Sequence, residues 1–242
     1  MRQTGRHQPN NQVPLKVTGT FPPLLDGPRL APASGKPARQ LVVILHGYGA
    51  DGLDLIDLGR AWQGQLPDAA FVAPNAPEHL PFEALGGRQW FALQERDPSE
   101  YRLGAQAAQP VLDRFLDDEL ARHSLEGSAL ALVGFSQGAM MTFQCGLRRP
   151  SPPAALIGYS GLLPGAGQLG PVNTQSPVLI VHGEEDDVVA SYHAQTAQKA
   201  LDDAGVSSSL HLLAGLGHSI DERGMVLGGR FLEKAFGPTM PV

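Results

Sequence analysis

Gly134-Phe135-Ser136-Gln137-Gly138 is the stretch that decides the fold of this chain. An apolar run, residues 128–133, precedes it, and a second apolar segment, residues 139–147, follows it. This order predicts a strand, a sharp turn with a serine at its apex, and a helix. Such a Gly-x-Ser-x-Gly turn can be a nucleophile elbow, in which a strained backbone lifts the serine hydroxyl clear of the sheet. The pattern also fits an ordinary glycine-rich turn, so the rest of the chain must supply a base, an acid and an oxyanion hole.

Length and composition indicate one globular domain. The 242 residues suffice for one α/β domain with a full core, and 42% of them are apolar. A net charge of −6 argues against a nucleic-acid partner or an anionic membrane surface. We see no apolar run of membrane-spanning length, no signal peptide, and only one cysteine, Cys145, which we expect to be a small apolar residue of a helix. We therefore expect a cytoplasmic protein without integral membrane contact.

Apolar runs alternate with helical patterns along most of the chain. We expect buried strands at residues 41–45, 69–73, 128–133, 154–160, 178–181 and 208–213. We expect helices at residues 54–66, 103–123, 139–147, 191–204 and 221–236. An edge strand is expected within 27–32, an irregular stretch at 78–102 and a loop at 162–177. This alternation predicts a single α/β domain, residues 25–242, with a mostly parallel sheet covered on both faces. Residues 1–24 are expected to form a flexible arm, and no insertion is large enough for a lid domain.

Polar residues follow four of the predicted strands. They are His46, Ser136, the acidic run 184–187 and His218. The carboxyl ends of parallel strands meet at one edge of a sheet, where ligand sites form. A serine nucleophile needs a base, and the base needs an acid to fix its tautomer. Because serine, acid and histidine follow in the order found in α/β-hydrolases, we predict that fold and a catalytic triad.

The base is predicted more sharply than the acid. Of eight histidines, His218 alone follows the last strand, in a glycine-flanked loop that can fold back over Ser136. Any three of the four acidic residues 184–187 also fit a solvated turn. Asp186 is favoured because it lies four residues after His182, which we expect to shape the same turn. The other three acids stay open alternatives, with the adjacent Asp187 the main one.

An oxyanion hole requires two backbone N–H groups close to the serine. One is predicted from the residue after the nucleophile, Gln137, and the other from the loop after His46. We choose Tyr48 for the second donor, with Gly47 and Gly49 as alternatives.

Six segments, spread from about residue 28 to the C-terminus, share a pattern with a known family. They are Leu45-His46-Gly47-Tyr48-Gly49-Ala50-Asp51-Gly52, Ala73-Pro74-Asn75-Ala76-Pro77, Gln89-Trp90-Phe91, Gly134-Phe135-Ser136-Gln137-Gly138-Ala139, His182-Gly183-Glu184-Glu185-Asp186 and Gly217-His218-Ser219. Through them the chain resembles the phospholipase/carboxylesterase family, the bacterial serine esterases related to acyl-protein thioesterases. Phe-Ser-Gln-Gly together with Trp-Phe is far more specific than Gly-x-Ser-x-Gly alone.

The resemblance implies a role for each of seven residues. It implies Ser136 as nucleophile, Asp186 as acid and His218 as base, with oxyanion donors from Tyr48 and Gln137 and a substrate pocket that includes Trp90 and Phe91. Two positions depart from the family. Asp187 stands where the family often has proline, and Tyr48 stands where the eukaryotic thioesterase branch tends to have leucine. The second departure places the chain nearer the bacterial esterases.

Residues and resemblance together predict a serine carboxylesterase. We expect hydrolysis of short- to medium-chain carboxylic esters through an acyl-enzyme, with a small-molecule ester as substrate and without metal or cofactor. A lysophospholipase or acyl(-protein) thioesterase is the alternative within the same chemistry. A non-catalytic hydrolase-fold binding protein is the alternative outside it. The resemblance also allows a homodimer.

Overall fold

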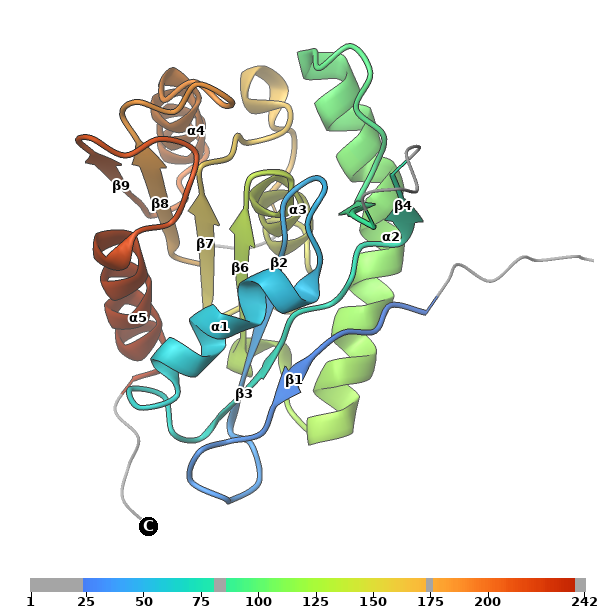
Figure 1. The fold of residues 1–242 in the computed structure, drawn as a ribbon, viewed down its shortest axis with the longest axis vertical. Coiled ribbons are helices and arrows are strands. Elements are labelled where there is room, and N and C mark those ends of the chain that lie inside the picture. The colour runs from blue at the N-terminus through green and yellow to red at the C-terminus, as the bar shows by residue number, and fades with distance from the viewer. Residues whose placement is uncertain (1–23, 81–85, 173–175, 238–242) are drawn as a thin grey trace, which may run out of the picture.

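A seven-stranded sheet lies at the centre of the molecule (Figure 1). The structure is a computed structural model, and it describes residues 24–80, 86–172 and 176–237. The strands are β1 (Arg29–Leu30), β2 (Gln40–Leu45), β3 (Ala69–Val72), β6 (Leu130–Phe135), β7 (Ala155–Tyr159), β8 (Val178–Gly183) and β9 (Ser208–Leu213). Their order is β1-β3-β2-β6-β7-β8-β9, and every neighbouring pair is parallel except β1 with β3.

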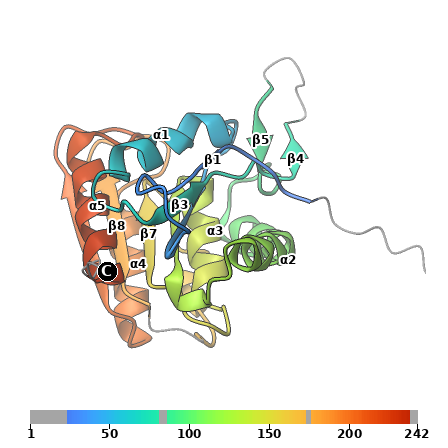
Figure 2. The same cartoon turned by 90° about the horizontal axis from the view of Figure 1, so that it is seen from below.

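Helices cover both faces of this sheet (Figure 2). One face carries α1 (Gly52–Trp62) and α5 (Glu222–Phe236), and the other carries α2 (Pro98–His123), α3 (Gln137–Gly146) and α4 (Tyr192–Asp203). The strand sequences explain the two cores, because successive side chains of a strand point to opposite faces. In β2, Leu41, Val43 and Leu45 pack on the α2–α3–α4 side, and Val42 and Ile44 pack on the α1–α5 side.

The α/β-hydrolase fold predicted from the sequence is confirmed, but three helix starts were placed too late, that of α3 by two residues, since it begins at Gln137 rather than 139. Helix α1 begins at Gly52 rather than 54, because the Asp51 side chain caps it and Asp54 completes a capping box. Helix α2 begins at Pro98 rather than 103, because Asp97 accepts hydrogen bonds from the N–H groups of Ser99 and Glu100. The apolar spacing becomes visible only about half a turn inside α1 and more than one turn inside α2.

The expectation of irregular structure at 78–102 was wrong in part. The stretch contains the first residues of α2 and a small antiparallel sheet of β4 (Glu78–His79) and β5 (Arg88–Gln89). Two-residue strands are too short to show an alternating pattern, so the sequence carried no signal for them. The loop expected at 162–177 likewise contains a short 3₁₀ turn, Ala166–Gln168. The expected arm, residues 1–24, lies outside the described residues except for Leu24.

Strand β6 and helix α3 meet in a very close contact at the serine turn. An added Cβ on Gly134 would lie 2.2 Å from the carbonyl oxygen of Gly138. One on Gly138 would lie 2.0 Å from the carbonyl oxygen of Leu45, at the end of β2. Real Cβ atoms do not approach backbone this closely, so both positions require glycine. The two glycines of the Gly-x-Ser-x-Gly pattern therefore have a structural reason that is independent of any chemistry at Ser136.

Gly138→Ala should destabilise the protein because its methyl group would collide with the backbone of β2, which cannot move without disturbing the sheet. We expect the free energy of unfolding to fall by at least about 2 kcal/mol, measured by urea denaturation. Gly167→Ala is the matched control, because an added Cβ there meets nothing within 4 Å. Equal stability of the two variants would contradict the packing argument.

Candidate active site

Ser136 occupies the turn between β6 and α3 with a strained backbone. Its φ is 54° and its ψ is −116°, a region that residues with a Cβ rarely adopt. The Ser136 N–H donates to the carbonyl oxygen of Tyr159 on the neighbouring strand, at 2.9 Å. This bond and the glycine contacts hold the turn in place. The serine lies at the carboxyl end of the sheet, where it remains 9% exposed.

Asp186 and His218 are brought together from segments that follow β8 and β9. His218 Nδ1 lies 2.8 Å from Asp186 Oδ2 and 3.1 Å from Oδ1. The His218 ring also lies against Phe135, the residue before the serine, with ring centroids 4.9 Å apart. The hydrogen bonds of the described residues join His218 to Asp186 but not to Ser136. The histidine is therefore held by the acid and placed beside the serine turn.

Asp186 differs sharply from its acidic neighbours. Its side chain is buried and its Oδ1 accepts the N–H groups of Val188 (3.0 Å) and Val189 (2.8 Å). Glu184, Glu185 and Asp187 are exposed. Burial by itself would raise the pKa of Asp186, but the Val189 N–H, the His218 hydrogen bond and the Val188 N–H together lower this pKa below its usual value. The carboxylate beside His218 is thus kept ionised at neutral pH.

His182 is a contact of Asp186 that the sequence reasoning treated only as a turn residue. It is fully buried, and its Nε2 lies 2.7 Å from the carbonyl oxygen of Val189 and 3.2 Å from Asp186 Oδ2. Its Nε2–H can donate to both oxygens. His182 and His218 therefore contact the same carboxylate oxygen, Asp186 Oδ2. The signal in the sequence was the four-residue spacing to Asp186, which was used only to choose among the acids.

The loop after β2 places backbone beside the serine. An added Cβ on Gly47 would lie 3.3 Å from the Ser136 Cβ. No backbone hydrogen bond of the described residues uses the N–H of Tyr48 or of Gln137. Gln137 opens α3, where the first N–H groups of a helix have no partner within the helix. Neither N–H group therefore has a backbone acceptor in the described part of the chain, and their role as oxyanion donors stays a prediction.

A buried polar network joins this loop to α3. The His46 Nδ1–H donates to the Gly47 carbonyl (2.8 Å), and its Nε2 accepts the Ala76 N–H (2.9 Å). Trp90 Nε1 donates to the carbonyl of His46, and the Trp90 N–H donates to Gln137 Oε1, both at 2.9 Å. The side chain of Gln137 then donates from Nε2 to the carbonyl of Phe91, at 2.8 Å. The network ties the loop that carries Tyr48 to the start of α3, which carries Gln137.

Trp90 and Phe91 are buried, with 1% and 5% exposure. Phe91 lies against α2, where a Cβ on Gly104 would come within 2.3 Å of its ring. Neither residue is among those that line the two cavities described below. Direct contact of this pair with substrate stays a prediction, and their observed contacts are with the protein itself.

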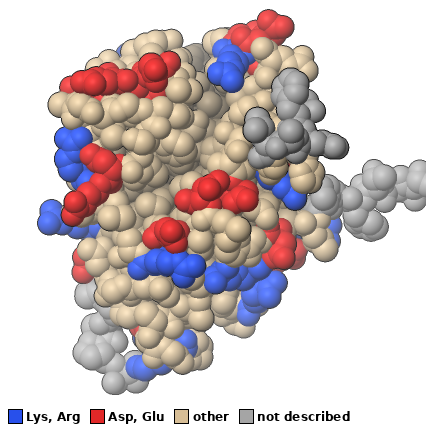
Figure 3. Space-filling model, in the orientation of Figure 1, with Lys and Arg blue, Asp and Glu red and all other residues tan. Residues whose placement is uncertain are grey.

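The described residues also bear on four other kinds of site, namely a metal site, a membrane-spanning helix, a reactive cysteine and a basic surface. Within residues 24–80, 86–172 and 176–237 no group of three or more His, Cys, Asp or Glu side chains is placed to hold a metal ion. No helix of this part of the chain is long and apolar enough to cross a membrane. Cys145 is buried in α3, and burial raises the pKa of its thiol well above the ordinary value. Figure 3 shows acidic and basic side chains interspersed on one face, without a continuous basic patch.

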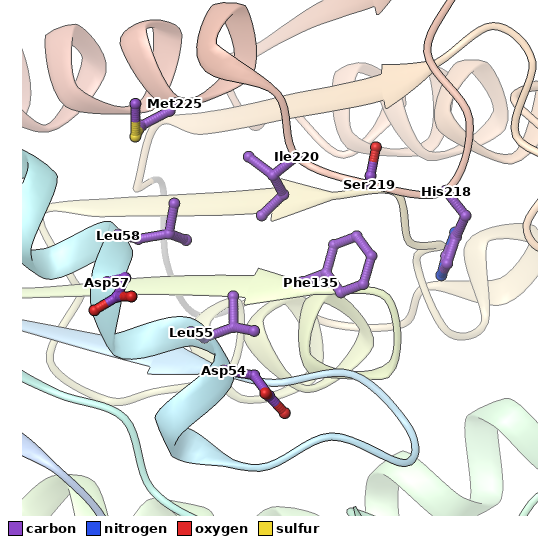
Figure 4. A pocket seen from close by; sticks show the side chains of 9 residues that line it. All are labelled: Asp54, Leu55, Asp57, Leu58, Phe135, His218, Ser219, Ile220 and Met225. Atoms are coloured by element: carbon purple, nitrogen blue, oxygen red, sulfur yellow. The ribbon is translucent and has the colours of Figure 1, made fainter.

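Two cavities open at the carboxyl edge of the sheet. The first, about 440 Å³, begins at His218 and Phe135 and runs between α1 and α5 (Figure 4). The second, about 490 Å³, lies between the start of α2, the loop after β7 and the start of α4. Leu162 lines this second cavity, and the residue before it, Gly161, lies close to Ser136. An added Cβ on Gly161 would lie 2.8 Å from the carbonyl oxygen of Ser136. Phe135, next to Ser136 in the chain, therefore lines the first cavity, and Leu162, which follows a close neighbour of Ser136, lines the second, whereas Ser136 itself lines neither.

Comparisons with known proteins agree with this fold and show the family of the chain. The sequence model described as Phospholipase/Carboxylesterase matches residues 31–236. The chain is 30% identical over 190 residues to Esterase YpfH of Escherichia coli, which covers 78% of this chain and 80% of that protein. It is 30% identical over 179 residues to Acyl-protein thioesterase 1 of Saccharomyces cerevisiae, covering 68% and 78%. The crystal structure of esterase PE8 superposes with a TM-score of 0.83 at 45% identity and covers 88% of this chain and 99% of that one.

Gln137→Leu should weaken the polar network because it leaves the Trp90 N–H and the Phe91 carbonyl without partners in the protein interior. We expect a loss of about 2–4 kcal/mol in the free energy of unfolding and faster hydrogen–deuterium exchange at residues 88–91. Gln144→Leu, on the same helix, removes a single side-chain bond to Gln109 and is the control. Unchanged exchange at 88–91 in Gln137→Leu would contradict the role of this side chain.

His46 should make folding stability depend on pH. Burial is the main cause that lowers its pKa below the ordinary value of 6.5, and its Nε2 is occupied by the Ala76 N–H. Below about pH 6.5 this histidine is protonated in the unfolded chain but stays neutral in the folded chain. The free energy of unfolding therefore falls as the pH falls. The free energy of unfolding of the wild type, measured by urea denaturation, should fall between about pH 7.5 and pH 5.5. In His46→Asn this fall should be smaller by about 1 kcal/mol. The exposed His79, changed to Asn, should leave the fall intact.

Proposed function

Because this chain belongs to the phospholipase/carboxylesterase family, we propose that it hydrolyses carboxylic esters of short to medium acyl chain through an acyl-enzyme on Ser136. The chain is an enzyme of the serine hydrolase class. The observation that carries the finer proposal is the 2.8 Å contact of His218 Nδ1 with a buried, ionised Asp186, beside a serine held at positive φ. That combination fits the acid, base and nucleophile of a triad.

The proposed reaction proceeds in two halves. His218 Nε2 takes the proton of Ser136 as Oγ bonds to the ester carbonyl carbon, and Asp186 stabilises the charged imidazole through Nδ1. The N–H groups of Tyr48 and Gln137 hold the negative oxygen of the tetrahedral intermediate. His218 then gives its proton to the alcohol oxygen, and the bond between carbonyl carbon and alcohol oxygen breaks. Water, deprotonated by the same histidine, then attacks the acyl carbon. The bond between this carbon and Ser136 Oγ breaks, His218 returns the proton to Oγ, and the carboxylic acid is released.

The expected preference for short and medium acyl chains is supported by the absence of a covering domain. No domain-sized insertion interrupts the sheet in the described residues, so a bound chain lies in open grooves rather than in an enclosed tunnel. A methylene group that stays partly in water gains only part of the about 0.8 kcal/mol of full burial. Lengthening the acyl chain should therefore bring diminishing gains in kcat/KM.

Thioester hydrolysis is the second candidate, and it is favoured by the likeness to the yeast acyl-protein thioesterase. The proposed triad would act on either bond, since both reactions pass through the same acyl-serine. Matched oxygen and thiol esters with the same acyl group separate the candidates by the ratio of their kcat/KM values. A lysophospholipase would instead show a maximum with long-chain single-acyl lipids. The expected cytoplasmic location and the homodimer stay predictions.

The proposed triad predicts that adjacent acidic residues behave differently. Asp186→Asn should lower kcat/KM for p-nitrophenyl butyrate by about 10³- to 10⁴-fold, because the histidine loses the charge that fixes its tautomer. Asp187→Asn, a matched change at an exposed neighbour, should stay within about twofold of wild type. Ser136→Ala should lose about 10⁵-fold or more in kcat.

Circular dichroism and thermal unfolding show whether each variant is folded before its rate is interpreted. A folded Asp186→Asn with wild-type activity would overturn the choice of acid. Retained esterase activity in folded Ser136→Ala would overturn the proposed mechanism as a whole.

A further inference from the structure

A groove starts at the catalytic edge of the sheet and continues between α1 and α5. We call it the α1–α5 groove, and its lining is Asp54, Leu55, Asp57, Leu58, Phe135, His218, Ser219, Ile220 and Met225. Figure 4 shows His218 and Phe135 at one end and Met225 at the other. The groove therefore extends the space around the proposed base along one face of the sheet.

Most of the lining is apolar and only partly covered. Leu55 and Leu58 come from α1, Ile220 from the loop before α5 and Met225 from α5, and all four are half-buried, as is Phe135. These side chains leave apolar surface facing a space of about 440 Å³. A contiguous apolar hollow beside a reactive group is the kind of surface that binds a ligand.

We propose that the α1–α5 groove binds the alcohol portion of the ester substrate, and that Asp54 favours neutral or cationic alcohols over anionic ones. This inference rests on the function proposed for Ser136 and His218. It adds a binding site and a chemical class of substrate to that function.

The position of His218 decides which part of the ester enters the groove. In acyl transfer to a serine, the histidine must reach the alcohol oxygen within hydrogen-bond distance to protonate it. The carbonyl oxygen of the same ester points to the N–H groups of Tyr48 and Gln137. The alcohol group therefore leaves along the wall that contains His218, and that wall opens into the α1–α5 groove.

The charges of the lining decide which alcohols are favoured. The lining contains two carboxylates and no lysine or arginine. Asp57 forms an ion pair with Arg60 at 2.7 Å, which offsets its charge. Asp54 is exposed, and its bond in the structure is from the N–H of Asp51 to Oδ2, at 3.0 Å. The charge of Asp54 therefore remains to attract a cation and to repel a phosphate or carboxylate on the alcohol.

A crossed series of esters tests the apolar part of the proposal. Butyrate esters of methanol to hexanol vary the alcohol, and methyl esters of two to ten carbons vary the acyl chain. Leu58→Ala and Met225→Ala should lower the hexyl-to-methyl ratio of kcat/KM by about five- to tenfold, mostly through KM. Leu55→Trp fills the groove instead of emptying it and should lower the same ratio.

Val226→Ala is the matched control for the α5 variant, since Val226 is adjacent to Met225 but is not part of the lining. The hexyl-to-methyl ratio of kcat/KM of Val226→Ala should equal that of wild type. If the groove variants change acyl-chain preference and leave alcohol preference unchanged, the groove holds the acyl part and the inference is wrong. Leu55→Trp keeps the test decisive if an alanine variant fails to fold.

A pair of isosteric esters tests the charge. Butyrylcholine and 3,3-dimethylbutyl butyrate have the same shape and differ by one positive charge. Wild type should favour the choline ester in kcat/KM by about two- to fivefold at low salt, and Asp54→Asn should bring the ratio close to one. Asparagine keeps an oxygen for the Asp51 N–H, so the helix cap is retained. Asp118→Asn, on α2, is the control and should keep the wild-type ratio.

The outcomes separate this inference from the function on which it rests. An unchanged ratio in Asp54→Asn, with esters still hydrolysed, overturns the charge preference alone. If neither ester series is hydrolysed by the folded wild-type protein, the proposed function fails instead.

Discussion

The positive-φ turn at Ser136 is the constraint on which the arrangement of the site depends. A serine at φ 54° is unfavourable by itself, so neighbouring contacts must hold it. Gly134 and Gly138 allow β6, α3 and the end of β2 to approach within distances that exclude a Cβ, and the Tyr159 carbonyl fixes the serine N–H. The sheet and helix thus specify the turn, and the turn presents the hydroxyl at the edge where the other strands end.

The polar side chains around this turn are oriented by hydrogen bonds to backbone groups and to other side chains. Asp186 accepts two backbone N–H groups and contacts two histidines, so the carboxylate is oriented before any substrate arrives. The loop that carries Tyr48, a proposed oxyanion donor, is tied through His46 and Trp90 to the side chain of Gln137. Such preorganisation is what electrostatic stabilisation of a developing oxyanion requires, because the donors need not reorient during the reaction.

The sequence predicted the strands and the serine turn because long β-branched runs and a five-residue pattern carry strong local signals. It placed the start of α2 too late, because a helix begins at its cap and Asp97 lies before the apolar spacing. It favoured Asp186 by its spacing to His182 but left the neighbouring acids open, since burial of one of them depends on which side chain accepts the Val188 and Val189 N–H groups. The role of the Gln137 side chain was missed because it arises from tertiary contacts 46 and 47 residues apart in the chain. The spacing of His182 to Asp186 was visible, but the sequence does not show that both side chains are buried and face each other.

Covalent labelling of the folded protein with a fluorophosphonate, followed by peptide mapping, tests the central claim most directly. The probe reacts with a serine only when a base and an oxyanion site are assembled around it. The account predicts one adduct per chain, on the peptide that contains Ser136, and no adduct after heat unfolding. An adduct on another serine, such as Ser160 or Ser219, or no labelling of the folded protein, would contradict it.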